Sequence, residues 1–216
     1  MIMRTTLLRL LLLAVVVLSV GQTAAAQDAE TVFERLRDKY ATIQSLRAEF
    51  TQTMTSAYTD EASSFTGQLV LEGDKYRVET GTEVLIVSDE EMYIYRPSEK
   101  QVLINDVVED DNSFSPSDFL LNYDERFNVS DVETVTLDGT RHYKLRLVPK
   151  NADSFFQEAT LWVRNSDTII TRVEVLDVND TKMVFALDNI QLNPTIDAKT
   201  FTFTPPAGVE VVDLRS

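Results

Sequence analysis

The sequence predicts a mainly β protein with few helices, built on a single curled antiparallel sheet of about ten or eleven strands. Two observations lead to this fold class. Short β-branched and aromatic runs follow one another from about residue 47 to residue 192, and Gly, Pro, Asp, Asn and Ser separate them. The separators are also too short for the crossover helices that parallel strands need, so successive strands are expected to pair antiparallel.

The first 26 residues are expected to be a secretory signal peptide. Arg4 and Arg9 supply positive charge, the following stretch to Val20 is almost wholly apolar, and Ala24-Ala25-Ala26 offers small residues for a cut near Ala26. The apolar run is too short to favour a stable transmembrane helix. The mature protein is then one exported domain, residues 27–216, of a size that typically forms a single core.

A helix is expected over residues 28–46, which contain no Gly or Pro. Apolar residues recur there at the spacing of one helix face: Val32, Leu36, Tyr40 and Ile43. A second, short helix is expected near residues 117–123, because Ser115-Pro116 is a common helix start. These two helices are the elements available to cover the long sheet.

The strands form two groups on either side of the short helix. The first group covers residues from about 47 to 54, then 65–72, 76–79, 83–87, 92–96 and 101–104. The second covers residues 127–137, 141–148, 154–164, 169–178 and 182–192. Asn179-Asp180, between the last two strands, predicts a hairpin turn.

Charge and composition exclude several classes of protein. The chain carries 35 acidic and 20 basic residues, a net charge of −15, which becomes −17 when Arg4 and Arg9 leave with the signal peptide. Phosphates would repel such a surface, so nucleic acid is not an expected partner. Cysteine is absent, which excludes disulfides, thiol catalysis, cysteine metal sites and a lipid-modified N-terminal cysteine.

Catalytic and metal-binding motifs are weak. The single histidine, His142, alternates with Tyr143 and Leu145 along its strand, so it is expected to face solvent rather than to act as a base. There is no Gly-x-Ser-x-Gly elbow and no phosphate-binding glycine pattern. The acidic run 109–112 lacks the ligand spacing of a calcium loop and is expected to be solvated. No enzyme activity, cofactor or metal is predicted.

Many apolar side chains are expected on the inner face of the strands. They are either simply core, or the lining of a ligand cavity that the few helices leave unfilled. The candidates are Phe50, Phe65, Leu69, Leu71, Tyr76, Val78, Val87, Tyr93, Tyr95, Leu103, Leu145, Leu147, Leu161, Val163, Val173, Val175, Met183, Phe185 and Leu187.

The C-terminal stretch Phe201-Thr-Phe-Thr-Pro-Pro-Ala-Gly-Val-Glu-Val-Val-Asp closely resembles the ending of the periplasmic outer-membrane lipoprotein carrier family, LolA. Further segments are similar to family segments in the same order. They are Leu46-Arg-Ala-Glu-Phe-Thr-Gln, Gly67-Gln-Leu-Val-Leu with Lys75-Tyr-Arg, Val87-Ser-Asp-Glu-Glu-Met-Tyr-Ile-Tyr-Arg-Pro, and Ser115-Pro-Ser-Asp-Phe-Leu-Leu. Together they span nearly all of residues 27–216.

The resemblance implies an incomplete β-barrel with a helical lid over an apolar cavity. It implies a monomeric carrier that takes lipidated proteins from an inner-membrane ABC transporter, shields their acyl chains, and passes them to an outer-membrane acceptor lipoprotein. That acceptor shares the fold but is itself a lipoprotein, so the absence of cysteine favours the carrier. The expected cavity residues are Phe50, Leu69, Leu71, Tyr76, Val78, Tyr95, Phe119, Leu120, Leu145, Leu147, Leu161, Val163, Val175 and Phe185.

One departure from the family concerns the lid. Family members often carry a Lys-Arg-Pro turn after the second strand, and its arginine helps to latch the lid. Here the turn is Glu72-Gly73-Asp74, which leaves Arg77 as the nearest candidate latch. If the lid gates the cavity, Leu161→Glu is expected to abolish binding without unfolding the protein.

Three rival functions remain open from the sequence. A lipid- or protein-binding envelope sensor or chaperone on the same fold would bind without transporting. An exported hydrolase would need a polar cleft with shifted carboxylates, and a structural envelope protein would have a filled core.

Overall fold

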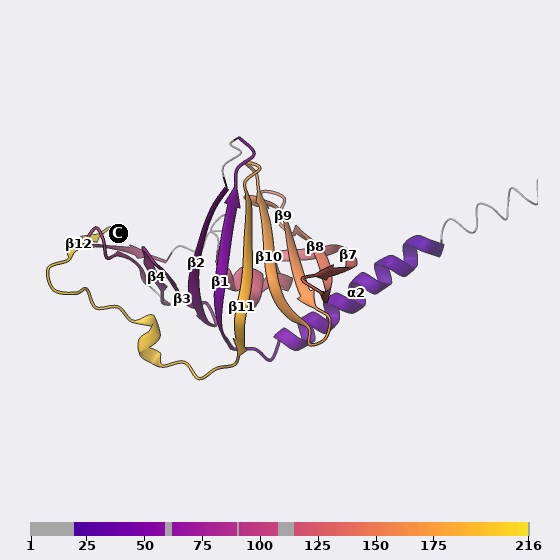
Figure 1. Cartoon of the computed structure of the whole chain (residues 1–216), viewed down its shortest axis with the longest axis horizontal. Helices are drawn as coiled ribbons and strands as arrows, with labels where there is room; N and C mark the ends of the chain where they lie inside the picture. Colours follow the sequence, from indigo (N-terminus) through magenta and orange to yellow (C-terminus); the bar gives the residue numbers. More distant parts are fainter. Residues whose placement is uncertain (1–19, 59–61, 90, 108–114, 216) are drawn as a thin grey trace, which may run out of the picture.

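The computed structural model describes residues 20–58, 62–89, 91–107 and 115–215, with side chains from residue 30 onward. One 12-stranded sheet dominates it, in the order β12-β6-β5-β4-β3-β2-β1-β11-β10-β9-β8-β7. The sheet fans out and curls, and short helices lie on its inner side (Figure 1). The predicted fold class, a single curled antiparallel sheet, is therefore confirmed.

Two meanders make up this sheet and join where β1 pairs with β11. Every neighbouring pair is antiparallel except β12–β6. The first meander consists of β1 (Ser45–Thr55), β2 (Ala62–Glu72), β3 (Lys75–Thr80), β4 (Val84–Val87), β5 (Glu91–Arg96) and β6 (Gln101–Asp106). The second consists of β7 (Phe127–Leu137), β8 (Thr140–Pro149), β9 (Phe156–Arg164), β10 (Ile169–Asp177) and β11 (Lys182–Leu192). The predicted hairpin at Asn179-Asp180 joins β10 to β11.

The N-terminal helix, α2 (Val20–Tyr40), ends earlier than residue 46, so the predicted C-terminal boundary is wrong. Residues from Ser45 onward pair as β1 with both neighbouring strands. Asn193 fixes the switch from helix to strand: its Oδ1 accepts from the Gln44 N–H at 2.7 Å, and its Nδ2 donates to the Thr42 carbonyl at 3.0 Å. Among the described residues, no helix is both long and apolar enough to cross a membrane.

The buried face of α2 covers the β7–β8 side of the sheet. Two short helices, α3 (Pro116–Leu120) and α4 (Tyr123–Arg126), lie beside it on the concave face. The Tyr123 ring contacts Phe33 and Tyr40 of α2 with centroid distances of 5.7 and 6.0 Å, and Phe119 contacts Phe156 of β9 at 5.4 Å. The three helices therefore share one apolar core with the second meander.

Two buried tyrosines in these helices, Tyr40 of α2 and Tyr123 of α4, allow the contribution of one buried hydrogen bond to stability to be tested. The Tyr40 hydroxyl accepts from the Ile170 N–H at 2.9 Å, whereas the Tyr123 hydroxyl has no hydrogen-bond partner among the described residues. We expect Tyr40→Phe to lower the free energy of unfolding by about 1–3 kcal/mol, because it leaves a buried N–H unpaired. Tyr123→Phe should leave it unchanged or raise it by about 1 kcal/mol. Urea unfolding measures both; a larger loss for Tyr123→Phe would contradict the contact assignment.

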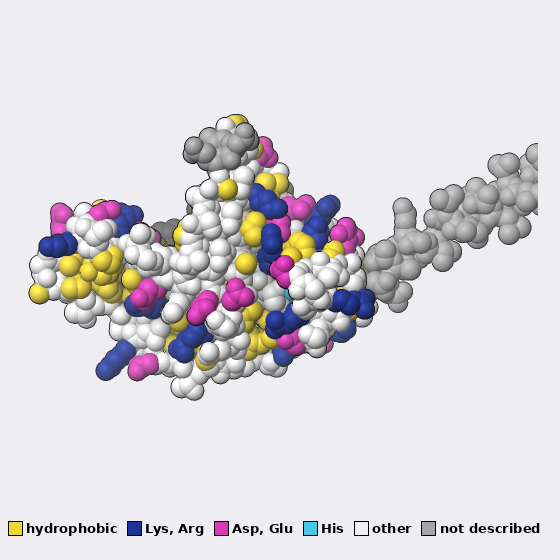
Figure 2. All heavy atoms as spheres, in the orientation of Figure 1, with side chains coloured by type: hydrophobic (Ala, Val, Ile, Leu, Met, Phe, Trp, Pro, Cys, Tyr) yellow, Lys and Arg dark blue, Asp and Glu magenta, His cyan; other side chains and the backbone are white. Residues whose placement is uncertain are grey.

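The C-terminal segment covers part of the convex face. The 3₁₀ turn η1 (Ala198–Phe201) buries Phe201 against Val70, Val84 and Ile86, and β12 (Glu210–Asp213) then pairs parallel with β6. Figure 2 shows hydrophobic side chains gathered at this end of the molecule. The sheet thus has 12 strands instead of ten or eleven, because β12 lies in a segment without a clear strand pattern.

Two aromatic residues expected on the inner face lie on this convex face instead. Tyr93 and Tyr95 alternate with the inward residues of β5 and pack on Phe203, with ring centroids 5.7 and 5.4 Å away. The prediction that Tyr95 lines the cavity is therefore wrong. Alternation shows only that the two rings share one face of the strand. The C-terminal segment covers that face, so the rings have an apolar environment on the convex side of the sheet and not in its interior.

His142 is buried, with 4% of its surface exposed, so its predicted solvent exposure is wrong. Its Nδ1 donates to the Thr140 carbonyl oxygen at 3.0 Å, and its Nε2 hydrogen-bonds to the Thr171 hydroxyl at 3.0 Å. Alternation correctly places His142 on the face opposite the inward Leu145, but the side chain is nevertheless buried there and contacts Thr171 of β10. Both ring nitrogens have structural partners, which fits a structural role.

Candidate functional site

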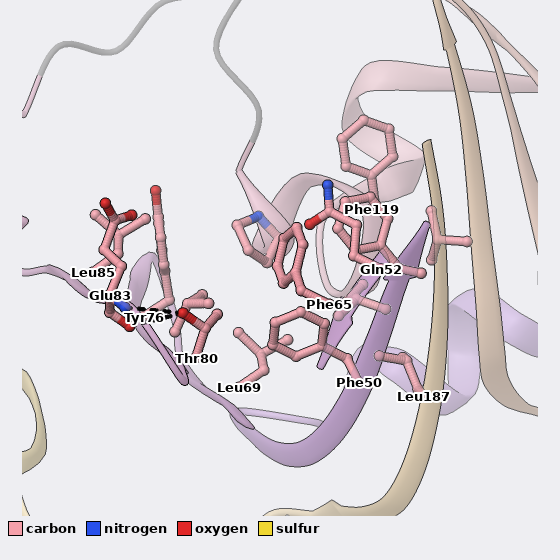
Figure 3. Close-up of a pocket in the computed structure, with 15 residues that line it drawn as sticks. Phe50, Gln52, Phe65, Leu69, Tyr76, Thr80, Glu83, Leu85, Phe119 and Leu187 are labelled. Carbon is pink, nitrogen blue, oxygen red and sulfur yellow. Dashed lines mark hydrogen bonds between the residues drawn. The ribbon is translucent and has the colours of Figure 1, made fainter. Parts of the chain in front are cut away.

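A pocket of about 230 Å³ lies on the concave face between the first meander, the β10–β11 hairpin and helix α3 (Figure 3). Its lining is mostly apolar. The lining residues are Phe50, Gln52, Phe65, Leu69, Tyr76, Val78, Thr80, Glu83, Leu85, Pro116, Phe119, Leu120, Val173, Phe185 and Leu187.

Strand register brings the walls of the pocket together. On the floor, Phe50 pairs with Gly67 on one side and Leu187 on the other. Between the neighbouring strands β2 and β3, Leu69 pairs with Val78. Because alternate residues of a strand share a face, these pairs all point inward. Pro116, Phe119 and Leu120 of α3 form the roof.

Burial falls from the floor to the mouth of the pocket. Phe50 and Leu187 are each 6% exposed and Leu69 is 4% exposed, whereas Phe65 is 42% exposed. The Phe65 ring packs edge-on against Phe50 with their centroids 6.1 Å apart. The apolar surface therefore continues from the closed floor to solvent.

Glycine 67 makes room for the floor. A Cβ added there would lie 2.7 Å from Phe50 ring carbons and 2.6 Å from the Glu79 carbonyl oxygen. We expect Gly67→Val to lower the free energy of unfolding by about 1–3 kcal/mol through overpacking and to displace the Phe50 ring into the pocket. Gly81→Val is the control, because a Cβ there meets nothing within 4 Å. Equal urea midpoints for the two variants would contradict the described packing.

The polar groups at the rim are largely engaged within the protein. The Thr80 hydroxyl donates to the Glu83 carbonyl at 3.2 Å, and the Glu83 carboxylate pairs with the Arg96 Nε at 3.0 Å. Burial raises the pKa of Tyr76, and the nearby Asp118 carboxylate raises it further, so Tyr76 is neutral at pH 7. In the described part of the chain no cluster of three or more His, Cys, Asp or Glu residues is arranged to hold a metal. The acidic run 109–112 lies outside the described residues.

The structure brings together one part of the predicted cavity set. Phe50, Leu69, Tyr76, Val78, Phe119, Leu120 and Phe185 all line the pocket. The prediction did not include Gln52, Thr80, Glu83, Leu85 or Pro116 as site residues. Phe65, Val173 and Leu187 had been recognised as apolar inward residues, but alternation carried no signal that they lie beside a pocket.

Apart from Tyr95, which lies on the convex face, the other predicted cavity residues are part of the filled core. Leu71, Leu145, Leu147, Leu161, Val163 and Val175 are each at most 1% exposed and pack in the cluster that α2, α3 and α4 cover. Leu161→Glu would bury a carboxylate in that core, so it is expected to unfold the protein rather than leave the fold intact. Cavity variants need half-buried positions instead.

Arg77 does not fit the role of a lid latch. It lies in register with Val70 and Ile86 on the convex face and pairs with Glu79 at 2.9 Å, while α3 covers the concave face. A different contact joins the lid to the β2–β3 turn: the Asn122 Nδ2 donates to the Asp74 Oδ1 at 3.3 Å. The turn that lacks the family's arginine therefore still touches the α3–α4 segment.

An open, strongly curled sheet with an apolar pocket roofed by short helices defines the class of half-barrel proteins with a concave apolar site. Within this class the chain belongs to the LolA family. The family model described as outer membrane lipoprotein carrier protein LolA matches residues 41–204.

Two relatives agree with this membership, and one solved structure shares the fold. A protein of Bordetella avium named outer-membrane lipoprotein carrier protein is 30% identical over 208 residues, covering 93% of this chain and 95% of the relative. A protein of the same name from Legionella pneumophila strain Lens is 31% identical over 196 residues, covering 85% and 91%. The crystal structure of an uncharacterized conserved protein from Thermus thermophilus matches with a TM-score of 0.53 at 13% identity, covering 86% of this chain and 99% of that one, which shows the fold alone.

Proposed function

We propose that this chain is a periplasmic lipoprotein carrier, which binds the acyl chains of lipidated proteins in the concave pocket and moves them from the inner to the outer membrane. The observation that carries the proposal is the mostly apolar pocket beneath α3, in which Phe, Leu, Val and Pro side chains make up most of the lining. Membership of the LolA family supplies the substrate class. The carrier acts without catalysis and without a cofactor.

Energetics require a partner that supplies energy. Each buried methylene contributes about 0.8 kcal/mol, so three chains of about sixteen carbons represent roughly 40 kcal/mol. A bilayer offers the same chains about the same stabilisation. The carrier therefore takes its cargo from an inner-membrane ABC transporter and releases it to an outer-membrane acceptor lipoprotein where one is present.

The pocket is small for that cargo. Its volume of about 230 Å³ is below the roughly 300–1,000 Å³ of ordinary small-ligand pockets. Loading therefore requires the roof to move, and α3 with α4 is the element that can do so. A solvent-exposed and therefore weak hydrogen bond from Asn122 to Asp74 joins their connecting segment to the β2–β3 turn. Phe119 and Tyr123 also anchor the two helices in the core that they share with α2 and the second meander, so opening the roof must disrupt that packing as well.

Export to the periplasm would bring the protein to its proposed cargo, the lipidated proteins. We propose that the signal peptide is cut near Ala26 and that residues 27–216 act as a monomer in the periplasm. The proposed cut lies within the span of α2, and it leaves the apolar face from Val32 to Tyr40 intact.

Proteoliposomes that contain the transporter and a triacylated lipoprotein test the proposal. With ATP and the mature chain outside, the lipoprotein should appear in the supernatant bound to the chain. Omitting ATP or replacing the chain with albumin should leave it in the membrane. Binding without ATP-dependent release would instead favour an envelope sensor or chaperone on the same fold.

A further inference from the structure

One amide side chain, that of Gln52, lies in the mostly apolar pocket. Gln52 projects from β1 into the space between Phe65 and Phe119, and Phe65 and Phe185 are its pairing partners on the neighbouring strands (Figure 3). Within the described part of the chain, its side-chain amide has no hydrogen-bond partner. An amide carries two N–H donors and a carbonyl acceptor, so this side chain has unused capacity in both senses.

Gln52 stands apart from the other polar groups of the lining. The side chains of Thr80 and Glu83 are engaged within the protein. The Tyr76 hydroxyl has no hydrogen-bond partner in the described residues either, but Tyr76 is only 9% exposed and lies near the Asp118 carboxylate. Gln52 is half-buried, so it is the uncommitted polar group at the outer level of the pocket.

The inward residues of β1 become steadily more exposed along the strand. Ala48 is 2% exposed and Phe50 is 6% exposed, Gln52 follows at the half-buried level, and Met54 is 37% exposed. A ligand whose apolar chain lies on Phe50 and whose head extends past Met54 would therefore cross the level of Gln52 where its apolar part ends.

We infer that the Gln52 amide binds the carbonyl groups at the root of the acyl chains, and so selects lipids with acyl linkages over plain hydrocarbon or ether-linked chains. Its N–H groups donate to an ester carbonyl oxygen, and its own oxygen accepts from the N–H of an N-acyl group. Covering the amide with a chain that lacks these groups would leave it desolvated and unpaired, which disfavours the wrong ligand. This inference rests on the proposed function.

Two synthetic probes of equal charge test it: an N-acyl, S-diacylglyceryl cysteinyl peptide, and the same N-acyl peptide with ether links in place of the two esters. The wild-type mature chain should bind the ester-linked peptide roughly three- to tenfold more tightly, the value of one hydrogen bond. Gln52→Leu should bind both peptides alike. Gln68→Leu, an amide-to-leucine change on the convex face of β2, should keep the wild-type ratio.

The outcomes separate the two ideas. If Gln52→Leu keeps the wild-type preference, or if the wild type binds both peptides equally, the role of Gln52 is wrong while acyl-chain binding stands. If the folded wild type binds neither peptide, even at concentrations that load other lipid carriers, both the role of Gln52 and the proposed function fail. Circular dichroism of each variant establishes that it is folded.

Discussion

Replacing Phe185 with glutamate is expected to abolish binding of lipoprotein acyl chains while the protein still folds. Phe185 lines the pocket and pairs with Gln52 and Val173 on the concave face. It is half-buried, so a carboxylate at this position can reach solvent when no acyl chain covers it. An acyl chain would have to cover that charge, which costs several kcal/mol, so affinity should fall by roughly a hundredfold or more.

The control for this variant lies on the same strand. Ala186 faces the convex side, where Arg172 is its pairing partner on β10, and Ala186→Glu adds the same charge away from the pocket. Its acyl-peptide affinity should equal that of the wild type, as measured by fluorescence titration. Equal affinities of Phe185→Glu and Ala186→Glu would place the ligand somewhere other than this pocket.

Tying the lid to the sheet should block loading completely. Asp74 and Asn122 are hydrogen-bonded at 3.3 Å across the junction of the β2–β3 turn and the α3–α4 segment. The chain has no native cysteine, so the double variant Asp74→Cys/Asn122→Cys can be bridged selectively with a short, reducible dithiol cross-linker. With the roof held closed, a pocket of about 230 Å³ cannot accept a triacylated peptide.

Reduction of the bridge provides the internal control. After the linker is cleaved, the same protein sample should load lipid at the wild-type level, and each single cysteine variant should load whether or not it is treated. If the bridged protein binds the triacylated peptide as tightly as the reduced protein, the gate is elsewhere.

The sheet was predictable because period-two alternation and turn residues mark each strand locally. The hairpin at Asn179-Asp180 and the strand pairs around it follow from that pattern. Helix α2 ends before its predicted limit because Asn193, almost 150 residues away in sequence, binds the backbone of Gln44 and Thr42. Strand β12 and the burial of Phe201 likewise depend on partners far away in the sequence. The local hydrophobic pattern therefore does not predict either of them.

The site was predicted only in part, for a related physical reason. Alternation says which residues share a face, but not which part of the face the helices fill. Leu145 and Leu161 face the same side as Phe50, yet they lie in the core that α2, α3 and α4 cover. No motif marks Gln52, because it is one amide among apolar residues; its place in the inward series of β1 is the only sequence feature that points to it.

Native mass spectrometry of the mature chain tests the central claim most directly. Residues 27–216 would be mixed with a detergent-solubilised triacylated lipoprotein, the detergent removed, membranes and aggregates pelleted, and the supernatant analysed together with a parallel sample of Phe185→Glu. We predict a soluble 1:1 complex for the wild type and none for the variant. A wild-type chain that stays empty, in the presence of transporter and ATP as well as without them, while all lipoprotein enters the pellet, would contradict a carrier of acyl chains.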